Sequence, residues 1–147
     1  MNREIFSRSE QETERIGETL AAELSPGDVV YLVGGMGAGK TCLARGVARG
    51  LGALVREVAS PTFAILHEYG GAEGEIRLRH LDLYRLKDRV GELEILGLPE
   101  SVAGAPVLVE WPGEAIRQLL PPTIEIRIET LAAGGRRIAV RPPIEPR

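Results

Sequence analysis

A glycine-rich segment between an apolar run and a helix-forming run limits most strongly what this chain can fold into. The segment at positions 34–41, GGMGAGKT, fits the pattern G-x-x-x-x-G-K-[ST]. The run Val29–Val33 before it is continuously apolar, which is typical of a strand buried on both faces. A helix is expected from about Lys40 to Leu51. Glycines let such a loop curl so that backbone N–H groups converge on one anion, towards which the following helix directs its positive end. The segment therefore predicts a nucleotide phosphate site.

Each residue type in a loop of this kind has a chemical task. Lys40 can reach the β- and γ-phosphates of a nucleotide, and the Thr41 hydroxyl can hold Mg²⁺. A purely structural glycine turn is the alternative, and the flanking strand and helix disfavour it. The expected nucleotide-binding residues of this segment are Gly35, Met36, Gly37, Ala38, Gly39, Lys40, Thr41 and Cys42.

Two acidic residues stand at the ends of apolar runs and are the expected partners of the metal. Asp82 follows the run that begins at Ile76, and Glu110 closes the run that begins at Val107. Ligands of open α/β sheets bind beyond the carboxyl ends of the strands, so both acids could face the phosphate loop. Mg²⁺ prefers oxygen ligands and usually takes one or two carboxylates. A solvated acid at a strand end is the alternative for either residue.

Three further residues have both a structural and a functional interpretation. Trp111 directly follows Glu110 and either packs in the core or lies beside the nucleotide. His80 shares a strand face with Asp82, but a lone histidine is more often structural. Thr62, in a loop after an expected strand, could respond to the γ-phosphate as a switch residue.

The size and composition of the chain bound the remaining possibilities. With 147 residues, 44% of them hydrophobic, it is expected to form one domain over residues 1–141, followed by a disordered proline-rich tail at 142–147. The formal charge of -3 argues against a broad basic surface for nucleic acid. A single cysteine and the lack of any 18-residue apolar stretch favour a cytoplasmic location without a membrane span.

The pattern of apolar runs and turn signals predicts an α/β fold of the P-loop nucleotide hydrolase type. Three layers are expected, with a mixed sheet that is parallel at its centre and antiparallel at its edges. Strands are expected at about 3–6, 29–33, 55–58, 63–69, 76–83, 106–110, 123–130 and 136–141, and helices at about 9–24 and 40–51, with a short helical segment at 92–97. Glycines at 70–74 and 134–135 predict two hairpin turns.

The residues alone leave several classes of nucleotide-binding protein open. A GTPase would need a guanine-reading Asn-Lys-x-Asp, but the only asparagine of the chain is Asn2. A small-molecule kinase usually has its loop very near the N-terminus and an arginine-bearing lid. Here a strand and a helix precede the loop, and Arg136 and Arg137 fall in an expected hairpin. An ATPase, such a kinase, and a nucleotide-dependent scaffold without turnover all remain.

Five motifs in a fixed order resemble the TsaE/YjeE family. They are GAGKT at 37–41, SPTF at 60–63, HLDLYRL at 80–86, ELE at 92–94 with Gly97, and VEWP at 109–112. The resemblance runs from about Ser7 to about Glu129. The chain departs from it in having Gly35-Met36 where the family usually has Asp-Leu, and Cys42 where a second threonine is frequent. These departures remove no expected phosphate donor or metal hydroxyl, and affect only the fine tuning of affinity.

The resemblance implies an ATPase subunit of the machinery that makes threonylcarbamoyladenosine in tRNA. ATP hydrolysis would depend on a complex with the proteins TsaB and TsaD. TsaD would transfer the threonylcarbamoyl group, while the ATPase cycle of this chain would reset the complex between turnovers. The chain itself would interact with tRNA only indirectly, through its partners. The cofactors would be ATP and Mg²⁺.

The resemblance also assigns roles by motif. Lys40, Asp82 and Glu110 form the expected catalytic set. Thr41 and Asp82 would place Mg²⁺, and Glu110 would join the metal shell or polarise the attacking water. Thr62 and Trp111 join the nucleotide-binding residues, and the segment 92–97 would move with the switch. Because the sequence has no obvious arginine finger, we expect slow hydrolysis by the isolated chain.

Overall fold

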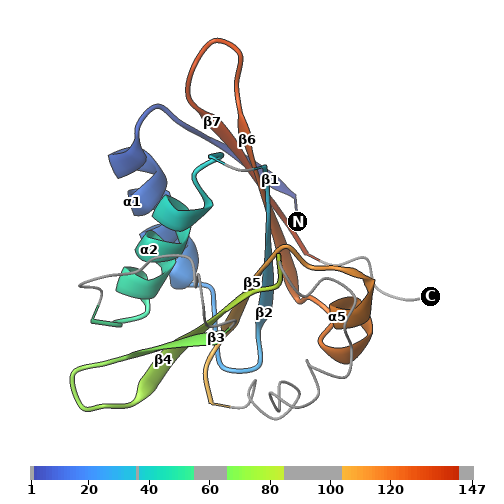
Figure 1. Ribbon diagram of the computed structural model, residues 1–147. Coiled ribbons are helices and arrows are strands. Elements are labelled where there is room, and N and C mark those ends of the chain that lie inside the picture. The colour runs from blue at the N-terminus through green and yellow to red at the C-terminus, as the bar shows by residue number, and fades with distance from the viewer. Residues whose placement is uncertain (1, 36, 55–65, 85–103, 143–147) are drawn as a thin grey trace.

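The structure is a computed structural model, described here for residues 2–35, 37–54, 66–84 and 104–142. Within these residues a single mixed sheet of seven strands runs through the molecule (Figure 1). The strands are β1 (Arg3–Ser7), β2 (Val29–Val33), β3 (Leu66–Gly70), β4 (Ile76–Asp82), β5 (Val107–Glu110), β6 (Ile124–Thr130) and β7 (Arg136–Arg141). Their order across the sheet is β1-β7-β6-β2-β5-β4-β3.

The direction of the strands changes from the centre of the sheet to its edges. Strand β2 pairs in parallel with both β5 and β6, and β5 pairs in parallel with β4. The pairs β3–β4, β6–β7 and β1–β7 are antiparallel. The expected α/β fold with a parallel centre and antiparallel edges is thereby confirmed.

In the described part of the chain, two helices cover one face of the sheet and a third lies on the other (Figure 1). Helix α1 (Glu10–Ala21) begins at Ser9, whose hydroxyl accepts a hydrogen bond from the N–H of Glu12, as the capping pattern predicts. Helix α1 ends before Leu24, which still packs against the core. Helix α2 (Lys40–Gly50) follows the phosphate loop directly.

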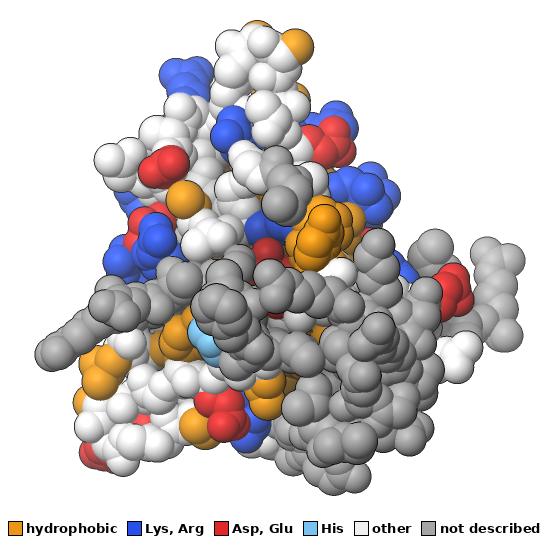
Figure 2. Space-filling model, in the orientation of Figure 1, with side chains coloured by type: hydrophobic (Ala, Val, Ile, Leu, Met, Phe, Trp, Pro, Cys, Tyr) orange, Lys and Arg blue, Asp and Glu red, His pale blue; other side chains and the backbone are white. Residues whose placement is uncertain are grey.

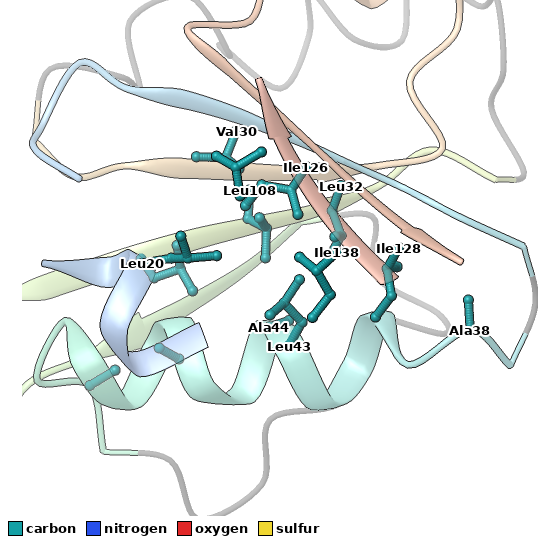
Figure 3. Close-up of a cluster of buried hydrophobic side chains, with 14 residues drawn as sticks. Leu20, Val30, Leu32, Ala38, Leu43, Ala44, Leu108, Ile126, Ile128 and Ile138 are labelled. Carbon is teal, nitrogen blue, oxygen red and sulfur yellow. The ribbon is translucent and has the colours of Figure 1, made fainter. Parts of the chain in front are cut away.

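The main core lies between α1, α2 and the sheet (Figure 3). Leu43 of α2 points at the inward-facing side chains of the sheet, among them Val30 and Ile126. The two helices cross closely at Gly46, where an added Cβ would lie 1.9 Å from the carbonyl oxygen of Glu14. This close crossing holds α2, and therefore the loop before it, firmly on the sheet.

Helix α5 (Glu114–Leu119) covers the opposite face and was not predicted from the sequence. Ile116 is fully buried there, and the Tyr31 hydroxyl of β2 donates a 2.6 Å hydrogen bond to the carbonyl of Leu120. Burial raises the pKa of Tyr31 to about 12. The helix is only six residues long, too short to show a helical repeat in the sequence. With α1, α2 and α5 the expected three layers are present.

Most of the predicted boundaries agree with the structure to within one residue, where the structure describes them. The strand expected at 63–69 corresponds to β3, which begins at Leu66 in the described part of the chain. The expected strand at 55–58, Thr62, the helical segment at 92–97 and residues 143–147 of the tail lie outside the described residues. Within the described ranges, no helix is long and apolar enough to cross a membrane.

Candidate functional site

The loop between β2 and α2 turns at two glycines and leads directly into the uncapped start of α2. Gly37 and Gly39 have φ angles of 75° and 105°, a left-handed region that side chains other than glycine rarely adopt. Gly39 precedes the first turn of α2 without any side-chain cap. The first N–H groups of a helix lack partners within the helix, so this end of α2 presents donors and a positive dipole. An anion such as a phosphate matches both.

Lys40, the first residue of α2, is buried with its ammonium group at this loop. Its residue exposure is 7%, and Nζ has no hydrogen-bond partner among the described residues. Nζ lies 3.9 Å from Oε1 of Glu110 and 3.6 Å from the centroid of the Trp111 ring. Burial lowers the pKa of Lys40, and the charges of Glu110 and Asp82 oppose that shift. A buried cation without an acceptor is the group that a phosphate oxygen would satisfy.

Asp82 and Glu110 lie next to each other at the carboxyl ends of β4 and β5. These parallel strands place the two residues directly opposite in register. Burial and the nearby charge of Glu110 raise the pKa of Asp82, while a hydrogen bond from the N–H of Tyr84 lowers it. Glu110 lies 3.9 Å from the Lys40 ammonium, and the negative charge of Asp82 is near enough to raise the pKa of Lys40 as well. The structure thus brings together the expected catalytic set.

His80 is a partner of Glu110. Nε2 of His80 lies 2.5 Å from Oε2 of Glu110, and both side chains are buried. The other oxygen of Glu110 faces Lys40. His80 therefore fixes the carboxylate of Glu110 from the side away from Lys40. The two residues are 30 positions apart, and no local pattern indicates their contact.

Trp111 belongs beside the loop and not in the core. Its ring packs edge-on against Tyr84 with 5.0 Å between ring centroids, and it faces the Lys40 ammonium. Among the described residues, Trp111 is the non-glycine residue with a positive φ, at 56°. This backbone conformation costs about 1–2 kcal/mol in an ordinary residue, so its surroundings must hold it.

A groove of about 940 Å³ extends from the loop along the end of β6 to α5. Its lining includes Gly35 and Ala38 of the loop, Trp111 and Tyr84, and Arg127 of β6. The groove therefore offers aromatic and charged side chains directly beside the phosphate loop.

The positions of the remaining predicted site residues bear less directly on the nucleotide site. Thr41 lies half-buried in the first turn of α2. The Cys42 thiol has a pKa raised by burial, and its charged neighbours are Glu10, Arg45 and Glu14, so the side chain faces α1. Only the backbone of Cys42 is left for a phosphate. Met36 and Thr62 lie outside the described residues.

The donor set around Lys40 suits Mg²⁺ bound together with phosphates. Across the described part of the chain, no group of three His, Cys, Asp or Glu side chains could hold a metal alone. Asp82 and Thr41 supply a carboxylate and a hydroxyl, the hard oxygen donors that Mg²⁺ prefers, and phosphates usually complete its shell. The residues present therefore fit this ion.

Comparison with known proteins places the chain in a family. A family model described as "Threonylcarbamoyl adenosine biosynthesis protein TsaE" matches residues 7–138. The chain belongs to the TsaE family. The resemblance inferred from the five motifs is thereby confirmed.

Individual TsaE relatives align over most of their length. A tRNA threonylcarbamoyladenosine biosynthesis protein TsaE from Treponema pallidum is 42% identical over 136 residues, covering 91% of this chain and 96% of that protein. The protein of the same name from Bacillus subtilis is 43% identical over 129 residues, covering 87% and 78%. The crystal structure of Bacillus subtilis YdiB superposes with a TM-score of 0.74 at 34% identity, covering 95% of this chain and 84% of YdiB.

Proposed function

We propose that this chain is the ATP-binding and ATP-hydrolysing subunit of a complex that makes threonylcarbamoyladenosine in tRNA. One observation carries the nucleotide site: the buried Lys40 ammonium, which has no hydrogen-bond partner among the described residues, lies at an uncapped helix start. Asp82 and Glu110 lie beside it. A nucleoside triphosphate with its magnesium ion matches these features in charge and in hydrogen-bonding type. The pathway is supported by the names of the relatives.

In this proposal the loop and the start of α2 bind the phosphates. Backbone N–H groups between Gly37 and Thr41 donate to phosphate oxygens, except that the N–H of Ala38 already donates to the carbonyl of Gly35 at 3.2 Å. Lys40 donates to the β- and γ-phosphates. Thr41 and Asp82 would hold Mg²⁺, directly or through water. When bound, Mg²⁺ neutralises the charge that develops on the phosphate oxygens.

Glu110 orients or polarises the water that attacks the γ-phosphorus, and it can also contact the metal shell through water. His80 fixes one of its oxygens, so the carboxylate keeps a single orientation without a contribution from the substrate. Attack forms the new P–O bond as the bond to the bridging oxygen breaks, releasing ADP and phosphate. Lys40 balances the charge on the leaving diphosphate.

The groove beside the loop is the proposed site of the ribose and the adenine. Trp111 and Tyr84 offer flat aromatic surfaces there, which suit packing against a base. ATP is favoured over GTP because the chain lacks the guanine-reading Asn-Lys-x-Asp.

The proposed partners are TsaB and TsaD, whose complex the ATPase cycle resets between turnovers. The charge distribution fits a protein-facing role better than direct binding of tRNA. The chain has a net charge of -3, and acidic and basic side chains are interspersed over the described residues on the face shown in Figure 2. Such a surface offers little attraction to a polyanion. Hydrolysis by the isolated chain is expected to be slow, with the partners completing the site.

Phosphate release from ATP, measured with and without the TsaB–TsaD pair, tests this function. We expect slow release by the chain alone, stimulation by the pair, and loss of both in Lys40→Ala. Arg49→Ala is the matched control, because Arg49 is a basic residue of the same helix that pairs with Glu14 and Glu18 at the surface. Stimulation should survive in this control.

The alternative functions give different products in the same experiment. A small-molecule kinase would yield a phosphorylated metabolite in place of free phosphate. A scaffold would bind ATP but release no phosphate under any condition, with or without the partners. Either result would contradict the proposed ATPase role.

A further inference from the structure

Arg136 contacts the phosphate loop from the side of the β6–β7 hairpin. Its Nε donates a 2.8 Å hydrogen bond to the carbonyl oxygen of Ala38, and Nη2 donates a 3.4 Å bond to that of Gly37. Nη1 donates at 3.0 Å to the carbonyl of Gly135. Within the described residues, these three bonds of the guanidinium all end on backbone carbonyls, two of them in the loop.

The backbone of Arg136 is paired with a neighbouring strand on each side, so the side chain extends from a fixed point of the sheet. Strand β7 lies between β1 and β6, and Arg136 pairs with Ser7 on one side and Thr130 on the other. The preceding Gly135 has a φ of 85°, and an added Cβ there would lie 2.6 Å from the carbonyl of Ser7. Gly135 therefore lies so close to Ser7 of β1 that the hairpin has little room to move there. Arg136 extends to the loop from this well-packed strand end.

A hydrogen bond to a carbonyl also directs the amide on the other side of the peptide bond. The C=O of Ala38 and the N–H of Gly39 belong to one planar trans unit and point in opposite directions. With the carbonyl held by Arg136, the N–H of Gly39 points away from the hairpin. Gly39 has a φ of 105° and, as a glycine, could adopt other conformations at little cost. The guanidinium restricts that freedom.

We infer that Arg136 is a positioning residue that holds the phosphate loop in its anion-binding conformation before a nucleotide arrives. The inference rests on the proposed function, since it assigns a task within the same site. If the loop is already ordered, nucleotide binding does not have to lose the conformational entropy of ordering it, and the affinity is higher. Hydrogen bonds from a charged donor are stronger than those from a neutral donor. The Arg136 guanidinium can therefore act as a clamp, which means that its hydrogen bonds to the two loop carbonyls hold the loop in place.

Arg136→Gln and Arg137→Gln form a matched pair of variants. Both remove one positive charge from the same strand, but Arg137 bonds to Glu129 at 3.1 Å and not to the loop. We expect Arg136→Gln to weaken ADP binding by about tenfold or more, and Arg137→Gln by less than about twofold. Arg136→Lys can keep one hydrogen bond to a loop carbonyl, so its ADP affinity should lie between those of the two glutamine variants. It is the conservative variant to use if Arg136→Gln folds poorly.

Hydrogen exchange of the nucleotide-free chain separates positioning from general stability. In Arg136→Gln, or in Arg136→Lys if the former does not fold, the loop and the first turn of α2 should exchange faster, while α1 exchanges as in the unaltered chain. Unchanged loop exchange with unchanged ADP affinity would overturn the clamp. Faster exchange throughout the chain would also overturn it, because the role would then be structural. Failure of the unaltered chain to bind ADP would instead refute the proposed function, and the clamp with it.

Discussion

The ammonium of Lys40 lies 3.6 Å from the centroid of the Trp111 ring, although no partner hydrogen-bonds to it in the described part of the chain. A cation over an aromatic face gains part of the energy that it lost by leaving water, but an aromatic ring satisfies no N–H donor in full. Oε1 of Glu110, at 3.9 Å, adds charge attraction without a hydrogen bond. The site is thus built around a cation that has no hydrogen-bond acceptor among the residues that the structure describes.

The first prediction concerns Lys40→Ala. ADP affinity should fall by about a hundredfold, because the charge-assisted hydrogen bond to the β-phosphate and the charge attraction of the ammonium to the diphosphate are both lost. Trp111 is the only tryptophan of the chain and lies beside Lys40, so titrating ADP while recording tryptophan emission measures the affinity. Arg49→Ala should keep the affinity of the unaltered chain. Micromolar ADP binding retained by Lys40→Ala would remove the lysine from the phosphate site.

The second prediction is a loss of ADP affinity at alkaline pH. Burial lowers the pKa of Lys40 from 10.5, so the ammonium loses its proton at a lower pH than a surface lysine does. Deprotonation removes the attraction to phosphate, and the affinity should therefore fall as the pH rises from 7 towards 10. Calorimetric titration at a series of pH values measures the effect. Lys40→Arg keeps its charge over this range and should show no such fall; an equally flat profile for the unaltered chain would contradict the prediction.

The third prediction is that Asp82→Asn stabilises the nucleotide-free chain while impairing its function. The pKa of Asp82 in the folded chain is raised, chiefly by burial, above its ordinary value of 3.8. The folded chain therefore binds this proton more tightly, and stability falls as the pH rises through the raised pKa. At pH 7 the asparagine avoids that penalty and can still accept the Tyr84 N–H. We expect the melting temperature to rise by about 2–4 °C, the change that ~1 kcal/mol produces in a domain of this size.

Two measurements check the third prediction. Well below pH 3.8 the carboxyl is protonated in both the folded and the unfolded chain, so the melting temperatures of Asp82→Asn and the unaltered chain should converge as the pH falls into that range. At pH 7 the variant should also lose the gain in ADP affinity that Mg²⁺ gives the unaltered chain. A variant less stable at pH 7 would show that the ionised carboxylate supports the fold, contrary to its raised pKa.

The centre of the fold and most of the site could be predicted from local sequence patterns. A continuous apolar run predicts a strand buried on both faces, and β2 is that strand. The acids at the ends of two such runs meet because β4 and β5 lie in parallel register, which sets Asp82 opposite Glu110. Ligand sites of parallel sheets form at that edge for the same geometric reason.

What the sequence did not predict depends on contacts between distant segments. Arg136 and Ala38 are 98 positions apart, and nothing local to the hairpin distinguishes Arg136 from Arg137. The contact of His80 with Glu110 depends on the pairing of β4 with β5. Trp111 could equally have packed in the core, and its positive φ, a backbone feature without a sequence pattern, accompanies its position at the loop. Packing decided each of these cases.

The last prediction separates binding from hydrolysis through Glu110→Gln. A glutamine has nearly the same shape and can still contact His80, but it lacks the charge needed to polarise water. ADP and ATP binding should remain within about threefold of the unaltered chain, while phosphate release with TsaB and TsaD falls by about a hundredfold or more. Glu68→Gln is the control, because Glu68 pairs with Arg79 at the surface of β3 and β4. Full turnover by Glu110→Gln would exclude its carboxylate from the chemistry, and a variant that lost ATP binding instead would make Glu110 a binding residue.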